Sequence, residues 1–164
     1  MSEQLRTILI IIVSVSIFGL LVFVFVKNYI KNKLNYYLNV KNNINYKLTC
    51  HCNKIEIDVK LVDGLNNLYR CNCSICKRKG AITAVIPKNN LKILKGENQL
   101  KFYQFNTNVA KHFFCNTCGI NTHNQRRSDP NTFGINVGCL DGISPKDLFE
   151  LNVRAVSYTH LTLP

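Results

Sequence analysis

The sequence predicts a mainly β domain that follows one N-terminal membrane-spanning helix. Three observations indicate this: Ile8–Val26 contains no charged residue, later segments alternate apolar and polar residues, and seven of the eight cysteines lie in close clusters. Alternation with a period of two is typical of half-buried strands. Closely spaced thiols are typical of metal sites carried on loops.

The uncharged block is the right length to cross a bilayer. As a helix its 19 residues would extend about 28 Å, close to the ~30 Å of the hydrocarbon core. One alternative is a signal peptide, but its apolar region is typically about 7–15 residues and ends in a small-residue cleavage site. This block instead ends in Val-Phe-Val-Lys-Asn-Tyr. A buried core helix is the second alternative, and we expect an uncleaved anchor after a short tail, residues 1–7.

The charges beside the block predict its orientation. Arg6 and Glu3 precede it, and four lysines follow it: Lys27, Lys31, Lys33 and Lys41. Because basic residues favour the cytosolic side of a membrane, we expect the remainder of a single-pass membrane protein to face the cytosol. Residues 27–47 read as a polar, basic linker or a juxtamembrane helix.

Several short strands are predicted in the following domain, residues 48–154. In residues 55–61 the apolar side chains alternate with Glu56, Asp58 and Lys60. Further strands are expected within residues 81–87, 91–96, 100–105, 109–115 and 132–140. In the last of these, Phe133, Ile135, Val137 and Cys139 would share one face.

The cysteines form three clusters with chelating spacing. These are Cys50 and Cys52 in "CHC", Cys71, Cys73 and Cys76 in "CNCSIC", and Cys115 and Cys118 in "CNTC". Four disulfides would suit a secreted protein, but a cytosolic placement argues against them. Disulfides within such short segments would also close very small loops and stabilise little.

Seven clustered thiols divide naturally into a set of four and a set of three. Zn²⁺ takes four protein ligands in structural sites, and three plus an open position in catalytic sites. The two distant pairs can complete the structural site, and the triplet can form the catalytic one. Iron in the four-thiol site is an alternative, as is a fourth ligand to the triplet from His51, His112 or His123. We expect Cys139 to be a core residue.

The net charge of +12 is weak support for nucleic-acid binding. Residues 48–164 carry +7 of it. Seven metal-bound thiolates and two Zn²⁺ ions would lower this balance to about +4, because metal-ligating thiols are deprotonated. We therefore expect no nucleic-acid partner.

The segments "TCHCNKIEI", "CNCSICKRKGA", "LKILKGENQLKFYQFNT", "KHFFCNTCGI" and "INVGCLDG" resemble the glutathione-dependent formaldehyde-activating enzyme family, also called the centromere protein V (CENP-V/GFA) domain. The resemblance extends from about Leu48 to Arg154. It implies a zinc-binding β fold of the Mss4-like type with two Zn²⁺ ions. By the family pattern, the structural zinc is bound by Cys50, Cys52, Cys115 and Cys118, and the catalytic zinc by Cys71, Cys73 and Cys76.

The resemblance also implies an activity. It is that of a carbon–sulfur lyase, which interconverts S-hydroxymethylglutathione with glutathione and formaldehyde. The expected partners are therefore a small thiol such as glutathione and, through the N-terminal helix, a membrane. The alternative is a non-catalytic, membrane-anchored interaction module in which both zinc ions are structural.

Two features depart from the family pattern. The N-terminal anchor is not part of it. The tail "AVSYTHLTLP", residues 155–164, resembles translated adapter sequence, so we expect it to be non-native and exclude it from the fold prediction.

Overall fold

The computed structural model describes residues 3–151 and 153–156. These fall into two compact units, residues 1–39 and 40–164. The predicted tail, residues 155–164, lies outside the described part of the chain except for Ala155 and Val156.

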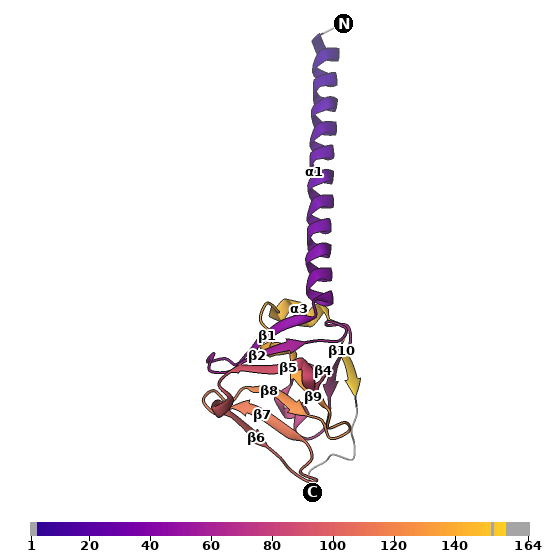
Figure 1. Cartoon of the computed structure of the whole chain (residues 1–164). Coiled ribbons are helices and arrows are strands. Elements are labelled where there is room, and N and C mark those ends of the chain that lie inside the picture. Colours follow the sequence, from indigo (N-terminus) through magenta and orange to yellow (C-terminus); the bar gives the residue numbers. More distant parts are fainter. Residues whose placement is uncertain (1–2, 152, 157–164) are drawn as a thin grey trace. The chain divides into compact units, whose positions relative to one another are not determined.

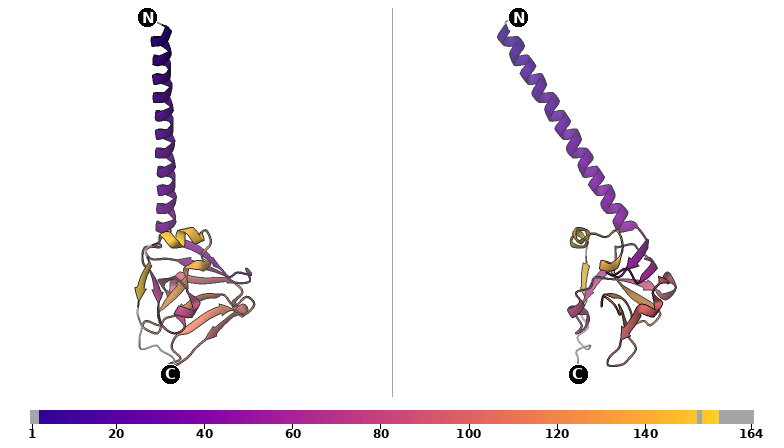
Figure 2. Two further views of the ribbon diagram at one scale, coloured as in Figure 1. Left: turned by 180° about the vertical axis from the view of Figure 1, so that it is seen from behind. Right: turned by 90° about the vertical axis from the view of Figure 1, so that its left-hand side faces the viewer.

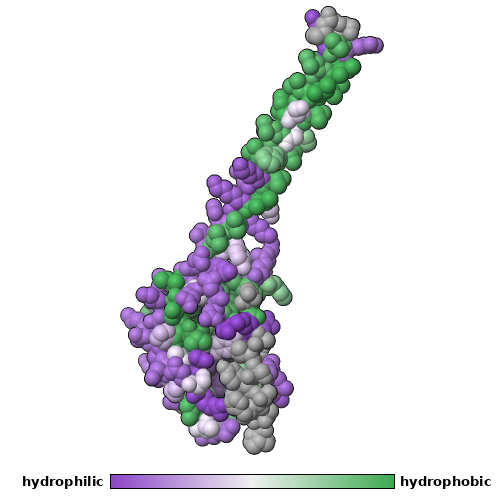
Figure 3. Space-filling view, turned by 90° about the vertical axis from the view of Figure 1, so that its right-hand side faces the viewer, coloured by the Kyte–Doolittle hydropathy of each residue, from purple (hydrophilic) through white to green (hydrophobic). Residues whose placement is uncertain are grey.

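The described part of the first unit is helical throughout and belongs to one long helix, α1 (Glu3–Asn42), which is unbroken in every view (Figures 1 and 2). It is long and apolar enough to cross a membrane, although buried core helices and signal sequences can meet the same criterion. Its serine hydroxyls bond within the helix: Ser14 and Ser16 donate to the carbonyls of Ile10 and Ile12 at 2.7 and 2.8 Å. Apolar side chains cover its first part, and hydrophilic ones become frequent toward residue 42 (Figure 3).

Residues 27–47, expected to be a linker or a helix, are helical as far as Asn42. A strand, β1 (Asn45–Thr49), then begins three residues before the predicted domain boundary at residue 48. Its Tyr46 and Leu48 are buried, so these residues belong to the β domain.

The second unit is mainly β, as predicted. One antiparallel sheet has the order β1-β2-β5, with β2 at Glu56–Lys60 and β5 at Leu91–Lys95. The other has the order β10-β3-β4-β9-β8-β7-β6. Its strands are β3 (Leu68–Cys71), β4 (Thr83–Pro87), β6 (Leu100–Tyr103), β7 (Lys111–Cys115), β8 (Asn121–Gln125), β9 (Thr132–Asn136) and β10 (Val153–Val156).

Apolar side chains from both sheets meet in one core. Leu48 and Ile57 come from the smaller sheet, and Leu68, Ile86 and Ile135 from the larger, and all five are fully buried. Short helices lie outside the sheets: α2 (Cys76–Lys79) and α3 (Pro145–Glu150). In α3, Ser144 and Asp147 form a capping box.

One predicted strand is shorter than expected. Residues 132–140 leave the sheet after Asn136, and Val137–Cys139 form a 3₁₀ turn. The Asn136 side chain accepts a hydrogen bond from the Gly138 N–H at 3.2 Å, which turns the chain out of the β conformation. Val137 and Cys139 are nevertheless buried, as the pattern predicted.

The backbone at Gly96 packs closely against the backbone at Lys54, and a substitution at Gly96 can test this contact. The φ of Gly96 is +77°, and an added Cβ would lie 1.9 Å from the Lys54 carbonyl oxygen. Gly142 has a φ of +81° but no heavy atom within 4 Å of that position. We expect Gly96→Ala to lower the free energy of unfolding by clearly more than the roughly 1–2 kcal/mol of left-handed strain. Chemical denaturation would measure this, with Gly142→Ala as the matched control that carries the strain alone. Equal losses would show that the backbone contact is unimportant.

Candidate metal centre and pocket

Two hairpin turns bring four thiols together. Cys50 and Cys52 lie in the turn between β1 and β2, where the Asn53 N–H donates to the Cys50 carbonyl at 2.9 Å and Asn53 has a φ of +56°. Cys115 ends β7 and Cys118 lies in the turn before β8, where the Gly119 N–H donates to the Cys115 carbonyl at 2.8 Å. Each turn therefore presents two sulfurs within one tight loop.

The four sulfur atoms all lie within 4.8 Å of one another. The Sγ of Cys52 is 3.6 Å from that of Cys50 and 3.7 Å from that of Cys115. When four sulfurs surround a zinc ion tetrahedrally at about 2.3 Å, neighbouring sulfurs are roughly 3.8 Å apart. The observed separations match this distance. They are far longer than a disulfide bond of about 2.05 Å. The donor set and its spacing therefore fit a closed metal site.

The other three clustered thiols come from one short segment. Cys71 ends β3, Cys73 follows in a loop, and Cys76 begins α2, whose left-handed Gly80 donates its N–H to the Cys76 carbonyl at 3.1 Å. Their sulfurs also lie within 4.8 Å of one another. Within residues 3–151 and 153–156, no fourth Cys, His, Asp or Glu joins this set.

In each set the environment favours ionisation of one sulfur and opposes that of another. A hydrogen bond from the Cys76 thiol, opposed by burial, lowers the pKa of Cys71 to about 6. The hydrogen bond to Cys71, together with burial, raises the pKa of Cys76. Burial raises the pKa of Cys118, but bonds from the Ile120 backbone and neighbouring groups bring it down to about 6. At Cys52 a bond from the Lys54 backbone acts to lower the pKa, but burial and the neighbouring thiols outweigh it and raise it to about 11. Thiolates are the form that binds metal.

The remaining cysteine is a core residue, as predicted. Cys139 is 8% exposed, and its Sγ donates to the Asn121 carbonyl at 3.5 Å. Burial, with a smaller contribution from nearby Cys50, raises its pKa to about 12. This thiol belongs to neither set.

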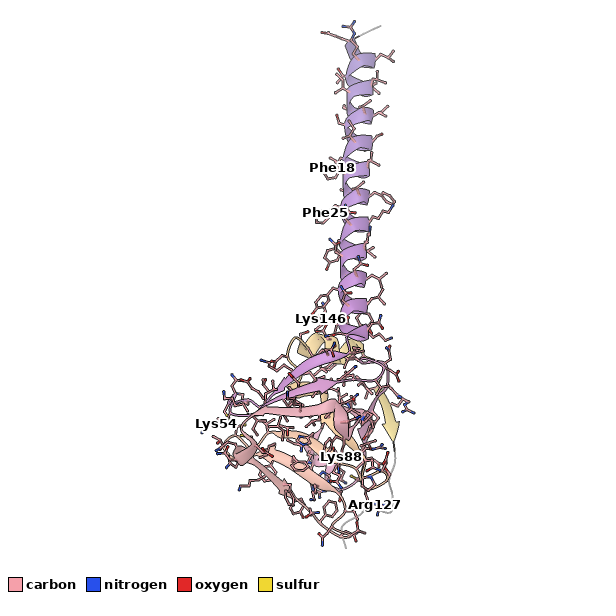
Figure 4. All side chains as sticks on the ribbon, viewed as in Figure 1. Phe18, Phe25, Lys54, Lys88, Arg127 and Lys146 are labelled. Carbon is pink, nitrogen blue, oxygen red and sulfur yellow. The ribbon has the colours of Figure 1, made fainter. Side chains whose placement is uncertain are left out.

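The three-thiol set opens onto a cavity of about 160 Å³. Its polar wall is contributed largely by strands of the larger sheet, among them Tyr69, Thr83 and Asn124. Ile75 and Phe105 add apolar surface, and Arg126 and Arg127 add positive charge. No Asp or Glu is among the described residues that line the cavity. Within the second unit, the β domain, Arg127 and Lys146 lie at opposite ends (Figure 4).

The three candidate histidine ligands lie outside both thiol sets. His51 is exposed in the β1–β2 turn. His123 is 2% exposed and stacks on Phe113 with 4.4 Å between ring centroids. His112 lines the cavity, but its Nδ1 is 3.1 Å from the Lys79 ammonium.

Comparison with known proteins identifies the family. The sequence profile of the glutathione-dependent formaldehyde-activating enzyme (GFA) family matches residues 45–155. That match spans most of the β domain and all seven clustered cysteines. The chain belongs to the GFA family.

Two proteins illustrate the similarity. A crystal structure of a Rhodobacter sphaeroides protein, a structural-genomics target, is 47% identical and superposes with a TM-score of 0.63, covering 67% of this chain and 99% of that one. A curated Emericella nidulans protein, provisionally named a glutathione-dependent formaldehyde-activating enzyme, is 27% identical over 81 residues. That match covers 47% of this chain and only 41% of the relative's length.

The GFA pocket contains residues that the cysteine spacing did not reveal. Tyr69, Thr83, Asn124 and the two arginines come from segments with no distinctive motif. Their shared feature is a position on one face of the larger sheet or at its end. That position depends on strand register, which the sequence pattern did not define for β3 and β8.

Proposed function

We propose that this GFA protein is a zinc-dependent carbon–sulfur lyase that acts on the adduct of formaldehyde with a thiol such as glutathione. The observation that carries the proposal is the three-thiol set at the wall of a pocket, without a fourth protein ligand among the described residues. Family membership supports this substrate class. We also infer that the β domain is of the Mss4-like type.

The two thiol sets would have different roles. Cys50, Cys52, Cys115 and Cys118 would hold a structural zinc ion between the two hairpins. Cys71, Cys73 and Cys76 would hold a second ion beside the pocket. A zinc ion there would lower the pKa of a substrate thiol and polarise an aldehyde carbonyl.

The other pocket residues would orient the substrate. The Arg126 guanidinium donates a 3.3 Å hydrogen bond to the Thr132 hydroxyl. The Arg127 guanidinium donates no hydrogen bond to another described residue. Both could bind a substrate carboxylate, because a guanidinium presents several donors in a fixed plane. Ile75 and Phe105 would limit the access of water to the reacting carbon.

Turnover by the full-length chain in detergent micelles tests the proposal. Exchange between glutathione, formaldehyde and S-hydroxymethylglutathione, followed by NMR, should be faster than the spontaneous reaction. Cys73→Ser should remove this acceleration, and Cys139→Ala is the matched control because that thiol lies outside both sets. No acceleration by the wild-type chain would refute this substrate. A binding module with two structural zinc ions would then become the better hypothesis.

The two sites should respond differently to loss of one ligand. Cys115→Ser disrupts the set that joins distant parts of the chain, so we expect a large fall in melting temperature and solubility. Cys73→Ser affects a local set, and the variant should stay mostly folded with about one zinc ion fewer. Metal analysis and thermal melts would measure both effects. Loss of two zinc ions and equal destabilisation in each variant would indicate that both sites are structural.

We further propose that α1 anchors the protein in a membrane with the β domain in the cytosol. The apolar block has no described buried residue, and its serine hydroxyls bond within the helix, as lipid surroundings require. The four lysines after the block favour this orientation.

Fractionated membranes allow both parts of that proposal to be checked. The chain should remain in the pellet after carbonate extraction, and protease added to sealed, cytosol-side-out vesicles should digest the β domain. A variant with Phe18→Lys and Leu21→Lys is the control, since two charges within the block should weaken insertion. Release of the wild-type chain by carbonate would exclude a spanning helix, and protection of the domain would reverse the orientation.

A further inference from the structure

A row of side chains crosses the larger sheet beneath the pocket. In the strand register, His112 of β7 faces Asn124 of β8, and Asn124 faces Gly134 of β9. Facing residues in antiparallel strands project from the same side of a sheet. Gly134 leaves room for its neighbours, because an added Cβ would lie 2.9 Å from the side chains of both Asn124 and Thr83. His112 therefore belongs to the polar floor of the pocket.

Lys79 reaches this floor from the three-thiol segment. It lies three residues after Cys76 in α2, so both side chains project from about the same face of the helical turn. Its Nζ is 3.1 Å from the Nδ1 of His112. Burial lowers the pKa of Lys79, and Coulombic interactions with Cys76 and Cys73 oppose this effect.

This contact determines the histidine tautomer. An ammonium group has donors and no acceptor, so with Lys79 charged Nδ1 of His112 accepts and the proton of the neutral ring lies on Nε2. Burial, and secondarily the charge of Lys79, lowers the pKa of His112 to about 4, which keeps the ring neutral. Phe105 stacks on the imidazole ring, with 5.9 Å between the ring centroids, and restricts the rotation of that ring.

The Nε2–H is the group left for a ligand. Among the described residues, the ring makes no other hydrogen bond, and no buried side-chain nitrogen or oxygen lacks a partner. Nε2 must therefore reach accessible space, and the space that His112 lines is the pocket shared with Cys71 and Cys76. A fixed donor is thus presented to whatever lies beside the thiols.

We propose that the Nε2–H of His112 donates a hydrogen bond to the aldehyde-derived oxygen of the substrate, and that Lys79 fixes the tautomer that makes this possible. The assignment rests on the proposed function. When thiol and aldehyde combine, the carbon–sulfur bond forms and the carbonyl π pair moves onto oxygen. The proton that left the thiol is balanced by the proton that the oxygen gains, so no other reactant is needed. In cleavage the carbon–sulfur bonding pair leaves on sulfur, the oxygen loses its proton and the carbonyl π bond re-forms, while the sulfur regains the proton as the thiol. In both directions His112 stabilises the charge on oxygen and Lys79 acts as a positioning residue.

Four variants of the zinc-loaded, full-length chain test this assignment. His112→Phe keeps a ring against Phe105 but removes the donor, and kcat should fall about 10²–10³-fold, as for the loss of an oxyanion donor. Lys79→Met should lower kcat about 10-fold, as for loss of a positioning hydrogen bond. Lys79→Arg should retain activity, because the guanidinium can still donate to Nδ1. Lys101→Met, which removes an exposed charge on β6, is the control and should match the wild type.

Readouts other than rate separate this role from a structural one. Nitrogen-15 NMR of labelled histidine should show the Nε2–H tautomer in the wild-type and Lys79→Arg chains, and a mixture in Lys79→Met. Zinc content and melting temperature should remain near wild type, and the KM for glutathione should change little.

The outcomes distinguish the two proposals. Turnover that survives His112→Phe, or an Nδ1–H tautomer in the wild-type chain, would overturn the assignment and leave the lyase proposal intact. Absence of turnover in the wild-type chain would overturn both. A loss of zinc in step with activity in Lys79→Met would show that the lysine supports the metal site instead.

Discussion

The meeting of the β1–β2 and β7–β8 turns is the constraint on which the rest of the β domain depends. The two turns belong to different sheets, and their four sulfurs lie within 4.8 Å of one another. A second junction lies nearby, where Thr49 donates to the Asp141 carboxylate at 2.7 Å and Leu48 bridges to Leu140. Fixing one edge of the larger sheet against the smaller sheet also fixes β7 and β8, and these strands carry His112 and Asn124 into the pocket.

The larger sheet uses its two faces for different purposes. Leu68, Ala84 and Ile135 face the core, where apolar burial stabilises the fold. Tyr69 and Thr83, each one position from a core residue, project toward the pocket, as does Asn124, which pairs with Gly134 next to Ile135. Because side chains alternate along a strand, the register that buries the core also determines which polar groups meet the substrate.

The sequence was most informative where a local pattern was sufficient. The seven clustered cysteines and the alternation in residues 55–61 predicted the thiol sets and β2, and the resemblance predicted the family. The pattern did not predict β8, because Asn121–Gln125 contains no apolar residue and its Thr122 and His123 are buried through pairing with neighbouring strands. Nor could it predict the contact between Lys79 and His112, which are 33 positions apart. Its extension of the last strand through Cys139 was wrong, because the Asn136 side chain turns the chain at Gly138.

The spacing of the thiols along the chain also bears on how the protein emerges from the ribosome. Cys71, Cys73 and Cys76 lie within six consecutive residues, so all three can bind a metal ion as soon as that segment has left the ribosome. The four-thiol set must wait for Cys118, and until then Cys50 and Cys52 remain on the nascent chain without the other pair. Joining ends so far apart has a greater loop-closure entropy than closing that short segment. During translation, the sulfurs beside the pocket can therefore assemble before those that join the two sheets.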